Sequence, residues 1–313
     1  MSSAVVRVVH MKSDDHVRTD AEKIRQLGVL EAEAETIRER DKVLVRGLFR
    51  NFYGKQLKVG IGFTRAWGAI LSGDYFDLIH LPDGNYLFVF ADISGHGLPA
   101  YTNLVRLRSA ITIATKRAGV IYNETGGIDF DYLVRDIVAM FTDVMEEAES
   151  HDFACVIFTF IYNEGDKFHL KFYNRSMLFP VVIRKFMGKV LDVYNLNCED
   201  KGWFPNKANF LSCDVRAMLG DQYYVTPSCT FTIYEGDTIL YFSDGIIESC
   251  HSQRPNEEFG EERLIQKLLE NINYDPQAVI YDIFNAVYEF IGRKENQKDD
   301  MTAVLIDFPS VRT

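Results

Sequence analysis

The sequence lacks the patterns typical of disulfide-rich, zinc-binding and membrane-spanning proteins. Its five cysteines, an odd number, include no C-x-x-C pair, so neither a disulfide framework nor a thiolate zinc site is expected. The longest apolar run, near residues 153–162, is about half as long as a membrane-spanning helix. The first apolar stretch, at residues 4–9, contains Arg7 and is too short for a signal peptide. We therefore expect a cytoplasmic protein with reduced cysteines.

The sequence also lacks an excess of positive charge. It has 45 acidic and 34 basic residues, which gives a formal net charge of -11. Nucleic acids and anionic membrane surfaces are bound by clustered lysine and arginine, so neither is an expected partner. Phosphate chemistry stays open, provided that metal ions supply the positive charge. The length of 313 residues, with 47% hydrophobic and 25% charged residues, is typical of a folded globular protein.

Strand-forming and helix-forming segments alternate in blocks after residue 57. Strands are expected at residues 59–63, 69–80, 86–91, 153–162, 168–174, 180–186, 190–193, 230–234, 238–243 and 301–308. Helices are expected at residues 98–117, 129–149, 261–271 and 276–293. The strands between 153 and 193 suggest one meander. Because the strands form hairpin blocks interrupted by helix pairs, the predicted fold class is α+β, with mainly antiparallel sheets covered by helices.

Residues 17–50 form a distinct N-terminal segment that contains no proline. Its apolar residues recur at alternating spacings of three and four, which is a heptad pattern, and Asp41 interrupts it. The apolar positions are Leu27, Leu30, Ala34, Ile37, Leu44 and Leu48. One interpretation is a helix packed on its own domain. The other is a short dimeric coiled coil that acts as a signalling linker.

Four aspartate clusters lie at the ends of predicted strands or in the loops beside them. They are residues 73–77 (GDYFD), 91–97 (ADISGHG), 242–245 (FSDG) and 298–302 (KDDMT). Next to an apolar strand, a carboxylate leaves water only if it is paired, protonated or bound to metal. Oxygen ligands favour Mg²⁺ or Mn²⁺ over Zn²⁺. Carboxylates that converge from distant parts of the chain suit a two-metal site that activates water for attack on phosphate.

Each cluster alone has a simpler explanation. An Asp-Gly pair after a strand is more often a turn, and Asp74 or Asp77 alone would be a solvated strand residue. The Gly95-His96-Gly97 segment before a helix could bind an anion, but it lacks the further glycines of a nucleotide-binding loop.

Together and in this order, the clusters resemble the SpoIIE/RsbU-like branch of the metal-dependent protein phosphatases, which are relatives of the type 2C enzymes. The similar stretches are residues 66–77 (AWGAILSGDYFD), 90–100 (FADISGHGLPA), 234–248 (YEGDTILYFSDGIIE) and 298–306 (KDDMTAVLI). The resemblance implies an αββα sandwich, two Mn²⁺ or Mg²⁺ ions, and hydrolysis of phosphoserine or phosphothreonine. It divides the chain into a tail with a linker or regulatory helix at 1–50 and a phosphatase domain at 51–313.

The resemblance also implies roles for particular residues. Asp92 is similar to the carboxylate that bridges both metals, and the backbone carbonyl of Ile93 to the next ligand. Asp244 and Asp299 are similar to the remaining ligands of the first metal, with Asp300 as the alternative if the register shifts by one. Asp74 is similar to the acidic residue that holds metal-bound water. The candidate catalytic residues are Asp92 and Asp74, and the candidate metal ligands are Asp74, Asp92, Ile93, Asp244, Asp299 and Asp300.

The implied substrate is a regulatory phosphoprotein, such as an anti-sigma factor antagonist of the STAS type. A homodimer through residues 17–50 is the partner expected if that segment forms the coiled coil. Two other functions stay open: a non-catalytic regulatory module of the same fold, and a small-molecule phosphohydrolase that uses the same metals. The chain has Asn174-Arg175-Ser176 where family members often carry an Ala-Gly-His-type turn. Arg175 is expected either on the surface or in contact with phosphate. His96 is a candidate general acid or phosphate contact, or a residue that caps its turn.

Overall fold

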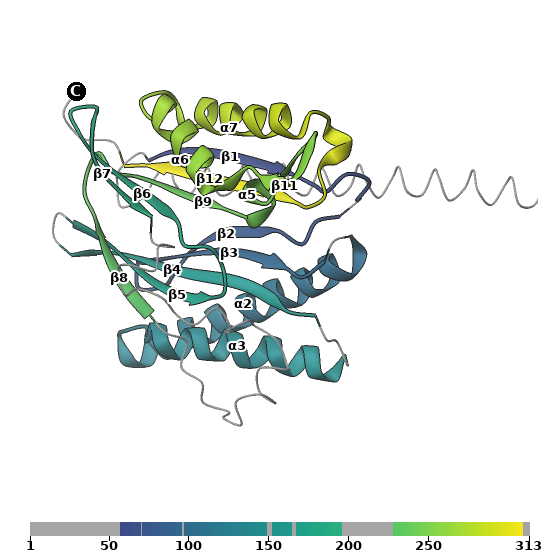
Figure 1. The fold of residues 1–313 in the computed structure, drawn as a ribbon. Helices are drawn as coiled ribbons and strands as arrows, with labels where there is room; N and C mark the ends of the chain where they lie inside the picture. Colours follow the sequence, from purple (N-terminus) through teal and green to yellow (C-terminus); the bar gives the residue numbers. More distant parts are fainter. Residues whose placement is uncertain are drawn as a thin grey trace, which may run out of the picture.

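The structure, a computed structural model, describes residues 57–308 except residues 70, 96, 149–151, 165–166 and 196–227. The predicted helix at 17–50 and the domain boundary near residue 50 lie outside these residues. Two five-stranded antiparallel sheets face each other, and helices cover the outer face of each (Figure 1). The sequence-based prediction of an αββα sandwich is thus confirmed. No helix in the described part of the chain is long and apolar enough to cross a membrane.

The first sheet carries helices α6 (Gly260–Asn271) and α7 (Pro276–Ile291) on its outer face. Its strands, in spatial order, are β1 (Lys58–Thr64), β12 (Met301–Asp307), β9 (Thr238–Phe242), β6 (Val181–Phe186) and β7 (Lys189–Asn195). The short helix α5 (Asp244–Ile247) follows β9, and the ribbon β10 (Cys250–His251) and β11 (Arg254–Glu258) leads into α6. The 3₁₀ turn η2 (Lys294–Asn296) joins α7 to β12.

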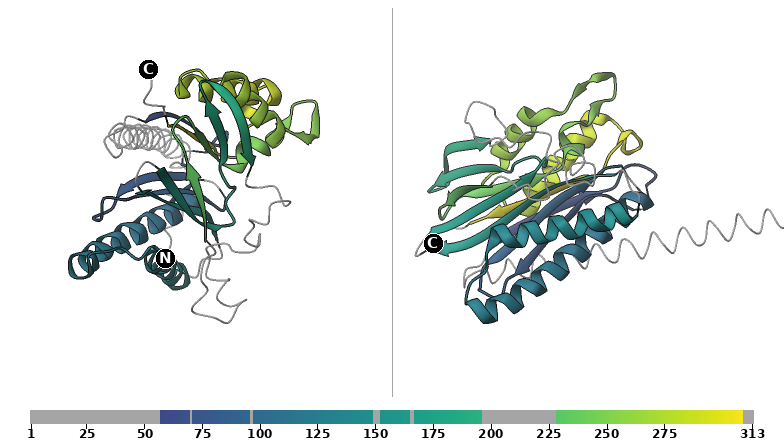
Figure 2. Two further views of the ribbon diagram at one scale, coloured as in Figure 1. Left: turned by 90° about the vertical axis from the view of Figure 1, so that its left-hand side faces the viewer. Right: turned by 90° about the horizontal axis from the view of Figure 1, so that it is seen from below.

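The second sheet carries helices α2 (Leu98–Thr125) and α3 (Phe130–Glu147) on its outer face, and the two helices run side by side (Figure 2). Its strands, in spatial order, are β2 (Tyr75–His80), β3 (Tyr86–Ile93), β4 (Ala154–Glu164), β5 (Lys167–Arg175) and β8 (Ser228–Ile233). Every strand pair in both sheets is antiparallel.

Alternation along the strands separates the core into a layer between the sheets and two layers under the helices. On β3, Phe88 and Phe90 point between the sheets, whereas Leu87 and Val89 pack toward α2 and α3. Tyr241 of β9 meets Phe88 with ring centroids 4.7 Å apart, and its hydroxyl donates to Thr159 Oγ1 of β4 at 3.1 Å. Because both faces of each sheet are covered, the central strands are almost continuously apolar.

The expected meander over residues 153–193 is wrong, because β4–β5 and β6–β7 are hairpins in different sheets. The chain changes sheets just after β5. There the Asn174 side chain accepts from Met177 N at 2.9 Å and donates to Met177 O at 2.8 Å. Ser176 adopts a φ of 58°, which turns the backbone away from the sheet. Strand-forming composition marked the strands but carried no information about their partners.

The predicted strand at 69–80 is too long, since β2 begins only at Tyr75. Residues 65–69 and 71–74 lie in the connection between β1 and β2, where Ala69 N donates to Ala66 O at 3.0 Å in a turn and Gly68 has a φ of 80°. In contrast, α2 extends beyond the predicted residue 117 and ends at Gly126, whose φ is 75°. The sequence did not indicate α5 or the β10–β11 ribbon, which are too short to show a period.

Candidate functional site

The strand order brings the aspartate clusters to one edge of the sandwich. β2 and β3 run antiparallel with Tyr75 opposite Ala91, so Asp74 before β2 lies near Asp92 toward the end of β3. In the facing sheet, β9 and β12 run antiparallel with Phe242 opposite Ala303. This register places Asp244, after β9, beside the Asp299-Asp300 pair before β12. The sequence clusters are therefore neighbours in space although they lie far apart in the chain.

Asp74 joins the two sheets directly. Its Oδ2 accepts from the Ser243 hydroxyl at 2.9 Å and from the Thr302 hydroxyl at 2.5 Å. Ser243 Oγ in turn accepts from Thr302 N at 2.9 Å. Burial raises the pKa of Asp74 well above its ordinary value, and the Asp300 carboxylate raises it further, although the two hydroxyl donors oppose these effects. Ser243 and Thr302 were not among the predicted site residues, although each is the hydroxyl residue of an aspartate cluster, at 242–245 and 298–302.

Asp92 is surrounded by like charge. Burial raises its pKa well above the ordinary value, and Asp74, Asp244, Asp299 and Asp300 raise it further, in that order. Among the described residues, no lysine, arginine or histidine forms an ion pair with Asp74, Asp92 or Asp244. Asp74, Asp92, Asp244, Asp299 and Asp300 are here called the carboxylate set, and within it the other four raise the pKa of Asp92 by like-charge repulsion.

Asp299 and Asp300 occupy different environments, which the sequence could not distinguish. Asp300 is 3% exposed, and its Oδ1 and Oδ2 accept from Ala66 N and Gly73 N, both at 2.8 Å. Asp300 therefore fastens both ends of the β1–β2 loop. Asp299 is exposed at the same edge, and its Oδ1 accepts from Asp300 N at 2.8 Å.

Two glycines allow the backbone segments of the site to approach one another. A Cβ on Gly73 would lie 2.6 Å from the Ile93 carbonyl oxygen, and a Cβ on Gly245 would lie 2.0 Å from the Asp300 carbonyl oxygen. Neither distance is possible for a side chain. Gly73 also accepts from Ile93 N at 3.3 Å, so the Ile93 peptide is held against the loop that carries Asp74. The predicted ligand carbonyl therefore belongs to this edge.

Cys155 lies opposite Asp92 in the β3–β4 pair. Burial, followed by the charges of Asp92 and Asp244, raises the pKa of its thiol to about 12. A thiol with such a pKa stays protonated at neutral pH and does not act as a nucleophile or a thiolate ligand. Cys155, Cys229 and Cys250, the three cysteines in the described part of the chain, are free thiols.

Arg175 does not lie on the surface, so that interpretation is wrong: the residue is only 3% exposed. It pairs with Val156, whose side chain belongs to the core layer under α2 and α3. Asp92 pairs with Cys155, which packs in the layer between the sheets. Strand alternation thus places Arg175 and Asp92 on opposite faces of the sheet. His96 lies outside the described residues.

The carboxylate set is not a preformed metal cage. In residues 57–308, apart from the gaps, no three histidine, cysteine, aspartate or glutamate side chains group closely enough to hold a metal ion. The chemistry of the set nevertheless fits a hard divalent cation. Its donors are oxygens, and a cation between them would relieve the repulsion that raises the pKa of Asp92.

Comparison with known proteins identifies the fold. The family model "Stage II sporulation protein E (SpoIIE)" matches residues 207–309, a stretch that includes Asp244, Asp299 and Asp300 but not Asp74 or Asp92. The SiaA-PP2C domain of Pseudomonas aeruginosa aligns with a TM-score of 0.62 and 14% identity, covering 92% of this chain and 98% of that one. A search of curated protein sequences found no match.

Two further solved structures show the same architecture. The PP2C phosphatase domain of SpoIIE from Bacillus subtilis, with a fragment of its regulatory domain, aligns with a TM-score of 0.56 and 16% identity, covering 82% of this chain and 63% of that one. The catalytic domain of the serine/threonine phosphatase PstP, in complex with two manganese ions, aligns with a TM-score of 0.50 and 12% identity, covering 81% and 99%.

The fold is therefore that of the PP2C-type phosphatase domains. Within this class, residues 207–309 match the SpoIIE family model, and the chain is similar to the SpoIIE and SiaA phosphatase domains, as its aspartate motifs predicted.

Proposed function

We propose that this chain is a Mn²⁺- or Mg²⁺-dependent phosphatase that hydrolyses phosphoserine or phosphothreonine in a regulatory protein. One observation carries the proposal: aspartates from both sheets converge at one edge of a PP2C-type fold, where burial and then their mutual repulsion raise the pKa of Asp92. The two manganese ions of the PstP domain support the choice of metal. The similarity to the SpoIIE phosphatase supports a phosphoprotein as the substrate.

The position of each aspartate suggests its role in the proposed reaction. Asp92, which all the other carboxylates repel, is the proposed bridging ligand, and the Ile93 carbonyl, Asp244 and Asp299 complete the donor set. Two divalent ions there would supply the positive charge and the activated water for attack on phosphate. The two hydroxyl donors both bind Oδ2 of Asp74. Its Oδ1 is therefore the oxygen that would accept from, and orient, a water molecule.

Asp300 has a different proposed part. Both of its carboxylate oxygens accept from the β1–β2 loop, so its proposed role is to hold Ala66 and Gly73 in place, and Asp299 is the proposed ligand of the pair. A STAS-type phosphoprotein as the particular substrate, and a homodimer formed through residues 17–50, remain part of the proposal on the family resemblance and the heptad pattern.

The decisive experiment measures phosphate release from phosphoserine and phosphothreonine peptides by the purified chain. We expect activity with Mn²⁺, its loss in EDTA, and its return when Mn²⁺ is restored. Asp92→Asn and Asp244→Asn should each lower kcat by several orders of magnitude and keep the circular dichroism spectrum, whereas Lys189→Ala on the exposed strand β7 should change neither. Full activity in EDTA, or normal turnover in both aspartate variants, contradicts the proposal.

The same assay separates the other two functions. Hydrolysis of phosphorylated metabolites and p-nitrophenyl phosphate, without hydrolysis of any phosphopeptide or phosphoprotein, identifies a small-molecule phosphohydrolase. A folded, Mn²⁺-loaded protein that hydrolyses none of these substrates is a regulatory module.

A further inference from the structure

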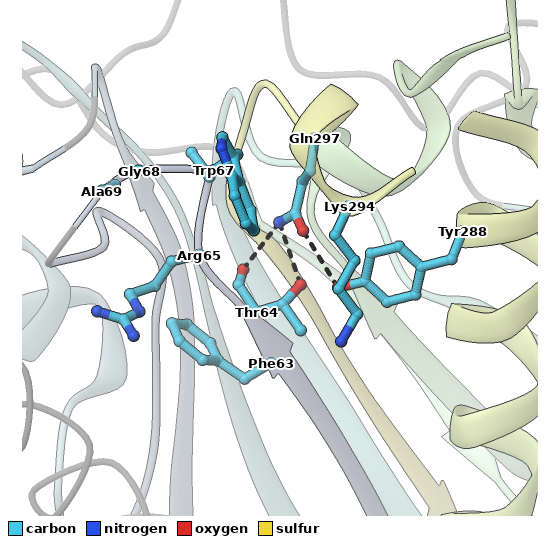
Figure 3. A pocket seen from close by; sticks show the side chains of 10 residues that line it. Phe63, Thr64, Arg65, Trp67, Gly68, Ala69, Tyr288, Lys294 and Gln297 are labelled. Carbon is cyan, nitrogen blue, oxygen red and sulfur yellow. Dashed lines mark hydrogen bonds between the residues drawn. The ribbon is translucent and has the colours of Figure 1, made fainter. Parts of the chain in front are cut away.

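A pocket of about 520 Å³ lies beside the carboxylate set, between the β1–β2 loop and the segment that joins α7 to β12 (Figure 3). Its walls are aromatic and basic: Phe63, Arg65 and Trp67 on one side, and Tyr288 and Lys294 on the other. None of the described residues that line it is acidic. This volume is within the usual range of ligand-binding pockets.

The wall of the pocket is joined to the proposed site by hydrogen bonds of Gln297. This residue is 5% exposed, and its side chain donates to Thr64 Oγ1 at 3.1 Å and to the Asp299 carbonyl at 2.9 Å. Its Oε1 accepts from the Tyr288 hydroxyl at 3.1 Å, and its backbone carbonyl accepts from Trp67 N at 2.9 Å. The same loop is fastened to Asp300 through Ala66 N. The pocket wall and the Asp299-Asp300 pair thus belong to one hydrogen-bonded segment, which places the pocket next to the carboxylate set.

The exposed chemistry of the pocket selects for a particular kind of peptide. Trp67 is 58% exposed, a large apolar surface of the kind that anchors protein contacts. Lys294 Nζ lies 5.3 Å from the centroid of the Tyr288 ring, which holds the ammonium group at the pocket wall. Arg65 adds a second positive charge at the opposite wall (Figure 3). In a chain of net charge -11, such a local basic pocket is complementary to carboxylates.

We propose that this pocket is a docking subsite for an acidic segment of the phosphoprotein substrate, next to the phosphorylated residue. The inference rests on the proposed function, because it assigns the substrate's flanking sequence to the same site. Trp67 would pack on the segment, and Lys294 would pair with its carboxylates, with the positive charge of Arg65 at the opposite wall.

Kinetics with paired peptides test the subsite. One phosphoserine peptide carries three flanking acidic residues, and its partner carries the corresponding amides. We expect the wild-type protein to have a kcat/KM about tenfold higher for the acidic peptide, and Trp67→Ala or Lys294→Glu to abolish this preference. Two control variants should preserve the preference for the acidic peptide. Tyr274→Ala removes an aromatic residue about as exposed as Trp67, and Lys189→Glu reverses the charge of an exposed lysine on β7. Hydrolysis of p-nitrophenyl phosphate, which is too small to reach the pocket, is the internal reference.

A binding measurement separates failure of the subsite from failure of the proposed function. The sequence has two tryptophans, so Trp203→Phe leaves Trp67 as the only tryptophan reporter. The unphosphorylated acidic peptide should change its fluorescence, and Lys294→Glu or high salt should remove the change. A fluorescence change without hydrolysis of any substrate supports the subsite and contradicts the phosphatase. Hydrolysis without acidic preference or fluorescence change overturns the subsite and leaves the phosphatase intact.

Discussion

At the scale of single residues, the site is held together by hydroxyl groups and backbone amides. Asp74 accepts from Ser243 and Thr302, and Asp300 accepts from two loop amides, so each aspartate is fixed by neutral donors. These bonds orient the carboxylates and leave most of their charge uncompensated. The uncompensated charge is what a divalent cation would use.

The neighbours Asp299 and Asp300 should respond differently to the same substitution. In Asp300→Asn, the side-chain amide group replaces one of the two carboxylate oxygens that accept a loop N–H. One hydrogen bond is lost and a buried N–H is left without an acceptor, so we expect the free energy of unfolding to fall by about 1–3 kcal/mol. Asp299→Asn changes an exposed residue and should alter stability by less than about 0.5 kcal/mol, but weaken Mn²⁺ binding. Urea unfolding without metal and Mn²⁺ titration measure the two effects. The reverse pattern would mean that Asp300 is the ligand.

The raised pKa of Asp92 makes the metal-free protein sensitive to pH. The unfolded carboxyl loses its proton near its ordinary value of 3.8, whereas the folded carboxyl keeps it to a higher pH. The folded state therefore binds more protons above pH 3.8, and stability is lost as pH rises through the folded pKa. Asp92→Asn should lose less stability over this range. Urea unfolding in EDTA at a series of pH values tests this, and parallel curves for wild type and variant would show that Asp92 contributes nothing.

At the scale of secondary structure, Arg184 ties the two sheets together at the start of β9, the opposite end of that strand from Asp244. Its Nη2 donates to the Thr232 carbonyl of β8 at 2.9 Å and to Asp237 Oδ2 at 3.0 Å. Asp237 is fully buried and also accepts from Tyr234 N. The Tyr234 ring lies 4.5 Å from the guanidinium carbon. The chain changes sheets here between β8 and β9.

Removing this arginine should destabilise the fold without changing the chemistry. Arg184→Ala leaves the buried Asp237 carboxylate without its partner, so we expect the free energy of unfolding to fall by about 3 kcal/mol. Turnover per folded molecule should stay at the wild-type value, because the carboxylate set lies at the other end of β9. Urea unfolding and kcat below the transition measure both, with Lys189→Ala as the matched control. An unchanged urea midpoint would show that the buried pair is not a stabilising link.

The sequence identified most elements because apolar periodicity reflects which residues are buried. It did not identify sheet partners, because the composition of β5 and β6 would be the same if they were paired in one sheet. In the structure they lie in different sheets, and the chain crosses from one to the other just after Asn174. The aspartates were found by their position beside apolar strands. The contacts that distinguish Asp299 from Asp300, or bring Ser243 to Asp74, depend on residues far apart in the chain. The same holds for Arg175, whose burial depends on where the helices pack.

At the scale of the whole molecule, the heptad pattern of residues 17–50 predicts control from outside the sandwich. Apolar residues on one stripe must bury against a partner, and Asp41 in the seam lowers stability while it fixes register. We expect a dimer in light scattering, and deletion of residues 17–50 should change turnover or oligomeric state while the sandwich stays folded. The segment has no regulatory role if the full chain is monomeric and the truncated chain keeps the same activity and melting temperature.

The position of β12 has a consequence for the order in which the protein can become active. β12 follows every other described strand in the chain, yet it lies between β1 and β9 inside its sheet. It also brings Thr302 to Asp74 across a sequence separation of 228 residues. A growing chain emerges from its N-terminal side, so β1 and β9 are synthesised before the strand that separates them. Until Met301–Asp307 inserts between them, Asp74 lacks the Thr302 hydroxyl and the carboxylate set is incomplete. We therefore expect that the proposed activity cannot appear during synthesis, and that a chain that stops before residue 301 lacks both the central strand of this sheet and the complete site.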